Sequence, residues 1–153
     1  MYRKHTNAYP VVGFSRPDYF SVIIVMAHKG ITGLDCLKGK KVAFGAVGST
    51  SKHLAPMQLL KDHGLDPLKD IVAMHIADNV AWEGLRRGDV AAIGTTNTVF
   101  LRSHGHEKSI QPGAFRVIVR SPDLPNDVLI AGPHVEKTMV DKVHKAFEPI
   151  HAN

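Results

Sequence analysis

A glycine loop followed by three consecutive hydroxyl residues is the part of this chain best suited to binding chemistry. The loop Gly45–Gly48 lies between an apolar segment, Lys41–Phe44, and the residues Ser49, Thr50 and Ser51. Glycines allow a sharp bend after a strand, and the unpaired N–H groups and dipole of a helix start attract anions. Hydroxyl groups add donors that can rotate onto tetrahedral oxygens. The pattern predicts an oxyanion cradle over residues 45–51.

Two catalytic motifs that resemble this loop do not fit it. The P-loop of nucleotide hydrolases ends in Gly-Lys-Ser/Thr, whereas here Gly48 precedes Ser49 directly and Lys52 follows the hydroxyls. The serine nucleophile elbow, Gly-x-Ser-x-Gly, lacks its second glycine. A structural alternative stays open, because Ser and Thr are common N-cap residues and the three hydroxyls could simply cap a helix.

Strand and helix patterns alternate along the rest of the chain. We expect strands over residues 10–14, 19–26, 40–44, 71–76, 90–94, 115–120 and 128–131, and helices near residues 54–63, 80–87, 98–103 and 135–147. This alternation predicts an α/β fold with a largely parallel sheet and helices on both faces. Pro56 lies inside the first helical pattern, so that helix has either a separate first turn or a kink.

Short polar side chains follow three of the expected strands. They lie in residues 45–51, 77–79 and 95–98, each directly after an apolar segment. Ligands of open α/β sheets bind where the carboxyl ends of the strands meet. The three loops therefore predict a site for a small polar ligand, most simply an oxyanion.

Composition excludes several other functions. A chain of 153 residues with 44% hydrophobic content suits one globular domain or two small lobes. The net charge of +5 comes from scattered basic residues without interleaved aromatics, so we expect no nucleic-acid partner. The longest apolar run, Val22–Ala27, is too short to enter a membrane as a spanning helix. The single Cys36 and the isolated pair His104 and His106 predict neither a metal site nor a cofactor.

Several stretches resemble, in order and spacing, the phosphate/phosphite/phosphonate substrate-binding proteins of ABC transporters. These stretches are Tyr19–Val25, Leu37–Gly45, Gly48–Ser51, Leu59–Asp66, Gly84–Ala92 and Ser121–Asp127. The resemblance runs from about residue 9 to the C-terminal helix. It implies a class II periplasmic binding fold, in which two lobes close on a ligand by a hinge.

The resemblance also implies a domain plan. Residues 1–29 would form the end of lobe one and the first hinge strand, residues 30–120 the complete lobe two, and residues 121–153 the second crossover and the return into lobe one. The early part of lobe one and a signal peptide would then lie outside this chain. Because lobe one would be incomplete, the apolar segment Phe20–Met26 could pair with a second copy, which predicts a homodimer.

Binding residues follow from the same resemblance. Ser49, Thr50 and Ser51 would hold the phosphonate oxygens, the hinge residue Tyr19 would also reach them, and the crossover residue Asp127 would face the ligand's substituent. No catalytic residue is implied, and the chain is not expected to be an enzyme.

Two positions depart from the family pattern. Asp78 and Asn79 stand where members often have a histidine and an acidic residue, and Asn97 lies where members often have an acidic residue. An ionised Asp78 would repel a dianion; it could accept from a protonated P–OH group or cap the helix near Val80. Asn97 offers no charge to a cationic ligand tail.

The resemblance implies the substrate-binding component of an ABC importer, which captures phosphonate, phosphite or phosphate and delivers it to a permease. It would work in the periplasm or at the cell surface. The alternative is the effector-sensing domain of a transcription regulator, because regulators of the LysR type use the same two-lobed fold.

Overall fold

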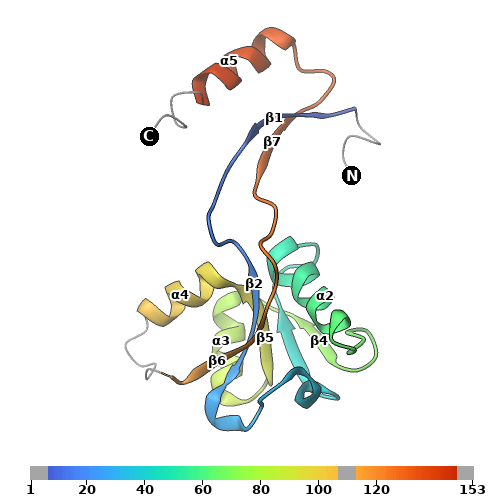
Figure 1. Cartoon of the computed structure of the whole chain (residues 1–153), viewed down its shortest axis with the longest axis vertical. Coiled ribbons are helices and arrows are strands. Elements are labelled where there is room, and N and C mark those ends of the chain that lie inside the picture. The colour runs from blue at the N-terminus through green and yellow to red at the C-terminus, as the bar shows by residue number, and fades with distance from the viewer. Residues whose placement is uncertain (1–6, 107–112, 148–153) are drawn as a thin grey trace. The chain divides into compact units, whose positions relative to one another are not determined.

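The computed structural model describes residues 7–106 and 113–147, which form two compact units (Figure 1). The first unit comprises the chain up to Pro17 and from Pro125 onward, and the second comprises Asp18–Leu124. The sequence instead places the boundaries after residues 29 and 120. The first boundary differs because residues 21–26 form a strand of the second unit's sheet.

The second unit is built on a mixed sheet. In the described residues its strands lie in the order β4 (Val72–His75), β3 (Lys41–Phe44), β5 (Ala92–Thr96), β2 (Ser21–Met26) and β6 (Phe115–Arg120). β3 runs parallel to β4 and β5, whereas β2 runs antiparallel to β5 and β6. The predicted α/β class is confirmed, and the parallel part of the sheet is confined to β3, β4 and β5.

Helices cover both faces of this sheet. They are α2 (Ala55–Asp62), α3 (Asp78–Arg87) and α4 (Asn97–His106), with short 3-10 turns at Ala27–Lys29 and Leu34–Leu37. A single π-helical turn, Thr50–Leu54, precedes α2. Pro56 therefore lies in the first turn of α2, where its missing N–H needs no helical partner. Of the two alternatives for Pro56, the separate first turn is the one observed.

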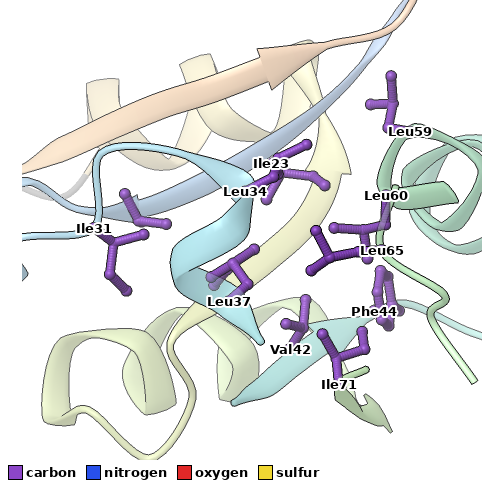
Figure 2. Packing of buried hydrophobic residues seen from close by; sticks show 12 residues of the cluster. Ile23, Ile31, Leu34, Leu37, Val42, Phe44, Leu59, Leu60, Leu65 and Ile71 are labelled. Atoms are coloured by element: carbon purple, nitrogen blue, oxygen red, sulfur yellow. The ribbon is translucent and has the colours of Figure 1, made fainter. Parts of the chain in front are cut away.

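The core consists of one apolar cluster on each sheet face. Figure 2 shows the first, in which Ile23, Val42 and Phe44 of the sheet face side chains such as Leu37 and Leu60. The second cluster joins the opposite sheet face to α3 and α4 through residues that include Ile24, Ile93, Leu85 and Phe100. These two layers bury both sides of the central strands.

Every residue of β2 is buried, and the strand is paired on both sides. The homodimer predicted from this segment assumed that it lacks a neighbour in its sheet. Because β5 and β6 fill both of its hydrogen-bonding edges, that argument for self-association does not apply.

The first unit is smaller. β1 (Tyr9–Gly13) pairs antiparallel with β7 (Val128–Ala131), with an irregular register between Pro10 and Val12. α5 (Lys137–Phe147) follows, and the ring of Phe147 packs edge-on against Phe14 at 5.7 Å. Within the described parts of both units, no helix has the length and hydropathy needed to cross a membrane.

Two glycines give a matched test of the packing in the second unit. A Cβ on Gly94 would lie 2.6 Å from Pro56 Cβ and 2.9 Å from Phe44 Cδ1, so β5 needs glycine where α2 crosses it. We predict that Gly94→Ala lowers the free energy of unfolding by about 1–3 kcal/mol. Urea unfolding followed by the fluorescence of Trp82, which packs in this unit, measures the change.

Gly84→Ala is the control. Gly84 lies within α3, and a Cβ there would meet Val90 Cγ2 at an ordinary contact distance of 3.7 Å. Alanine suits a helix interior better than glycine by about 1 kcal/mol, so this variant should be as stable as the wild type or more stable. Equal destabilisation by both variants would contradict the packing argument.

Candidate functional site

The polar loops of the second unit gather at one edge of its sheet. Because β3, β4 and β5 are parallel, the segments that follow them start at the same edge. β2 is antiparallel and pairs Ser21 with Thr96, so its first residues lie at this edge too. The structure thus brings together residues 45–51, 77–79 and 95–98, as the sequence suggests, and adds the start of β2.

Ser49 caps the turn that follows the glycine loop. Its Oγ accepts a hydrogen bond from the Lys52 N–H at 3.3 Å, and its carbonyl oxygen accepts from the N–H groups of His53 and Leu54 at 3.0 Å. The N–H groups of Thr50 and Ser51 precede these bonds and have no acceptor in the described part of the chain. The capping alternative therefore accounts for Ser49 alone and leaves two donors at the turn.

Ser51 ties this turn to the start of β2. The Tyr19 hydroxyl donates to Ser51 Oγ at 2.9 Å, and Ser21 Oγ donates to the Ser51 carbonyl oxygen at 2.6 Å. Ser51 and Ser21 are buried, while Tyr19 is half-buried. Two of the residues assigned by resemblance, Tyr19 and Ser51, are thus in direct contact through their hydroxyl groups.

Asp78 forms an ion pair with Lys52, a residue that was not among the predicted binding residues. Lys52 Nζ lies 2.5 Å from Asp78 Oδ2, and both side chains are partly exposed. Asp78 is the first residue of α3, and no side chain caps that helix start. A Cβ on Gly45 would lie 2.7 Å from Lys52 Cβ, so glycine at this position lets Lys52 cross the loop to reach Asp78.

The remaining predicted residues lie in different surroundings. Asn97 is buried and bonded to the start of β2: its amide nitrogen donates to the Asp18 carbonyl, and its amide oxygen accepts from the Phe20 N–H at 3.4 Å. Asn79 is exposed in the first turn of α3. Asp127 belongs to the first unit, where it pairs with Arg16 at 2.8 Å.

Two histidines hold the glycine loop. The Gly48 N–H donates to His53 Nδ1 at 2.9 Å, and His75 Nδ1 lies 2.9 Å from the Gly45 carbonyl oxygen. The two rings meet edge to face, with centroids 4.5 Å apart. Burial lowers the pKa of His53, and the nearby His75 ring lowers it further because two imidazolium ions would repel each other. The neutral form of His53 is also the one that can accept from Gly48.

Thr95 lies in the third polar loop expected from the sequence, but it was not among the individual residues predicted to bind a ligand. It is only 2% exposed, and its Oγ1 is buried without a hydrogen-bond partner among the described residues. Its neighbour Thr96 is satisfied, because Thr96 Oγ1 accepts from the Val99 N–H at 3.1 Å. A Thr-Thr pair at the end of an apolar strand was the available signal, but it does not say which hydroxyl has a partner.

No group of three His, Cys, Asp or Glu side chains within the described residues could hold a metal ion. The side chains of His104 and His106 lie outside the described residues.

The chain is similar to proteins that bind solutes for transport. A family model described as the periplasmic substrate-binding protein of phosphonate ABC transporters matches residues 1–152. Among solved structures, the binding-protein component of a Pseudomonas aeruginosa phosphonate ABC transporter has a TM-score of 0.71 and 21% identity, over 95% of this chain and 50% of that one.

Two further structures have the same fold. A Xanthomonas citri protein solved with bound ATP has a TM-score of 0.76 and 18% identity over 95% of this chain and 58% of its own. The aliphatic sulphonate-binding protein of Escherichia coli has a TM-score of 0.65 and 23% identity over 94% and 45%. These likenesses confirm the class II periplasmic binding fold, and the chain spans about half the length of these proteins.

The contact between His53 and His75 predicts a measurable titration. His53 should titrate below its ordinary pKa of 6.5, and His75→Gln should raise that pKa by removing the neighbouring charge. NMR of the ring protons across pH 4–8 measures it. His63→Gln is the control, because His63 bonds to the Leu59 carbonyl and does not touch this pair.

The same shift has a consequence for stability. Because the folded-state pKa lies below the unfolded-state value, the unfolded chain takes up the proton first as the pH falls. Neutral His53 therefore favours the folded state fully above pH 6.5. This part of the folding stability is lost as the pH falls from the unfolded-state pKa of His53 to its folded-state pKa. An unshifted His53 pKa in the wild type would contradict both expectations.

Proposed function

The chain belongs to the family of periplasmic substrate-binding proteins of phosphonate ABC transporters, and on that premise we propose that it forms the oxyanion-binding part of such a protein. The ligand is a small phosphorus oxyanion: a phosphonate, phosphite or phosphate. The observation that carries this proposal is the turn at Ser49–Ser51, where two N–H groups and the bonded hydroxyls of Tyr19 and Ser51 lie at the carboxyl edge of β3.

The donors of this turn suit an anion with several oxygens. The N–H groups of Thr50 and Ser51 are adjacent, and successive backbone amides can share one anionic group. The hydroxyls of Thr50 and Ser51 can rotate, and Tyr19 can donate to a ligand oxygen in place of Ser51 Oγ. Hydrogen bonds to charged acceptors contribute about 1.5–3 kcal/mol each, so a few such donors support specific binding.

Asp78 limits which ligands fit this turn. Its carboxylate is paired with Lys52, so the two charges offset each other beside the donors. The ammonium group provides a further donor, and the carboxylate retains lone pairs that can accept from a protonated P–OH group. Asn97, which is bonded to Asp18 and Phe20, adds no charge for a cationic tail. This arrangement favours phosphite, phosphate or a phosphonate with an uncharged tail.

In the longer protein, this role implies delivery of the ligand to an ABC permease from the periplasm or the cell surface. The family is defined by transport and not by catalysis. We accordingly assign no catalytic residue to the chain.

Binding of phosphate, phosphite or methylphosphonate should shift the backbone amide signals of residues 49–51 in an NMR titration of the full chain at millimolar ligand. Ser51→Ala removes the hydroxyl that Tyr19 contacts and should weaken binding by about 10- to 100-fold, the effect of one hydrogen bond to a charged ligand.

Thr32→Ala removes an exposed hydroxyl elsewhere in the second unit and should bind as the wild type does. The proposal fails if none of the three anions shifts these amides, or if Ser51→Ala binds them as tightly as the wild type.

A further inference from the structure

Among the described residues, the buried hydroxyl of Thr95 has no hydrogen-bond partner, whereas the hydroxyl of the adjacent Thr96 has one. A buried hydroxyl without a hydrogen bond costs about 1–3 kcal/mol, and isosteric valine would remove that cost. Thr96, the adjacent residue, uses its hydroxyl to bond the start of α4. The unsatisfied group at residue 95 therefore calls for an occupant that the described residues do not supply.

Thr95 lines a small cavity at the edge where the three loops meet. Gly45 contributes from the first loop, Asp78, Ala81 and Trp82 from the start of α3, and Thr95 from the end of β5. The cavity volume is about 10 Å³, which is at the lower limit for one water-sized atom. A space of this size matches a single oxygen atom.

The start of α3 makes this cavity suited to an oxygen that carries negative charge. α3 has ten residues and no side chain capping its first turn, so its first N–H groups point toward that end. Their partial positive charge favours an anionic oxygen. Lys52 reaches the same place through its ion pair with Asp78, so the carboxylate does not stand alone beside the anion.

We propose that Thr95 is a ligand-contacting residue of the oxyanion site, donating its hydroxyl hydrogen bond to one oxygen of the ligand at the start of α3. This inference rests on the proposed function and extends the site beyond Ser49–Ser51 to the end of β5. A ligand held on both sides would bridge the turn after β3 and the start of α3. Thr95 then helps to exclude anions whose oxygens cannot reach both places.

A trapped water molecule is the competing occupant. Water would satisfy Thr95 with or without the ligand, and the hydroxyl would then have no part in affinity. Thr95→Val separates the two cases, because it keeps the β-branched shape and removes only the hydroxyl. Thr95→Ser keeps the hydroxyl and removes a methyl group.

The experiment measures phosphate, phosphite and methylphosphonate binding to the full chain by NMR titration, with the Trp82 indole signal as a reporter that lines the same cavity. Thr95→Val should bind about 10- to 100-fold more weakly than the wild type, as expected for one lost hydrogen bond to a charged group. Its resistance to urea should be equal to or greater than that of the wild type. Thr95→Ser should retain most of the affinity.

Thr96→Val is the matched control, because it deletes the adjacent hydroxyl, which bonds to α4. It should lower stability and leave affinity unchanged. If Thr95→Val binds like the wild type while Ser51→Ala binds weakly, the assignment of Thr95 is overturned and the proposed function stands. If the wild type binds none of the three anions, both are overturned. Equal weakening by Thr95→Val and Thr96→Val would also overturn the assignment, since the effect would not be specific to the unpaired hydroxyl.

Discussion

Two hydrogen bonds to Ser51 connect the start of β2 with the turn after β3, and the polar edge of the second unit depends on them. β2 and β3 are not neighbours in the sheet, because β5 lies between them. The donors Tyr19 and Ser21 therefore reach across the end of β5 to hold the turn. Gly94 in β5 makes this approach possible, since it leaves room for Pro56 at the start of α2. The close packing of α2 on β5 and the positions of the hydrogen-bond donors therefore depend on each other.

Much of the fold follows from local sequence patterns. β6 and β7 span the residues expected from their apolar runs, and the helices at α3 and α5 begin within three residues of the expected positions. The place of β2 does not follow, because its buried run pairs with strands far along the chain and composition does not specify the partners. The domain plan implied by the family resemblance put β2 and β6 in different lobes, whereas both belong to the second unit.

The candidate site shows a similar division. The glycine loop with its hydroxyl residues could be recognised because the spacing from strand to helix is local. Lys52 could not, because its route to Asp78 depends on the missing side chain at Gly45. Nor does residue type distinguish Asn97, whose amide bonds to Asp18 and Phe20, from Thr95, whose hydroxyl has no partner within the described parts of the chain. Whether a buried polar group has a partner is a property of three-dimensional packing.

The ion pair between Lys52 and Asp78 also bears on how the proposed site would attract an anion. Because the two charges offset each other, the attraction comes mainly from oriented N–H and O–H groups at Ser49–Ser51 and at the start of α3. Such dipoles act over short distances, so they reward an anion whose oxygens match their positions. The chain's net charge of +5 is spread over its surface and is screened beyond about 8 Å at physiological ionic strength. In the proposed site, selectivity would therefore depend on the geometry of the donors and not on the overall charge of the protein.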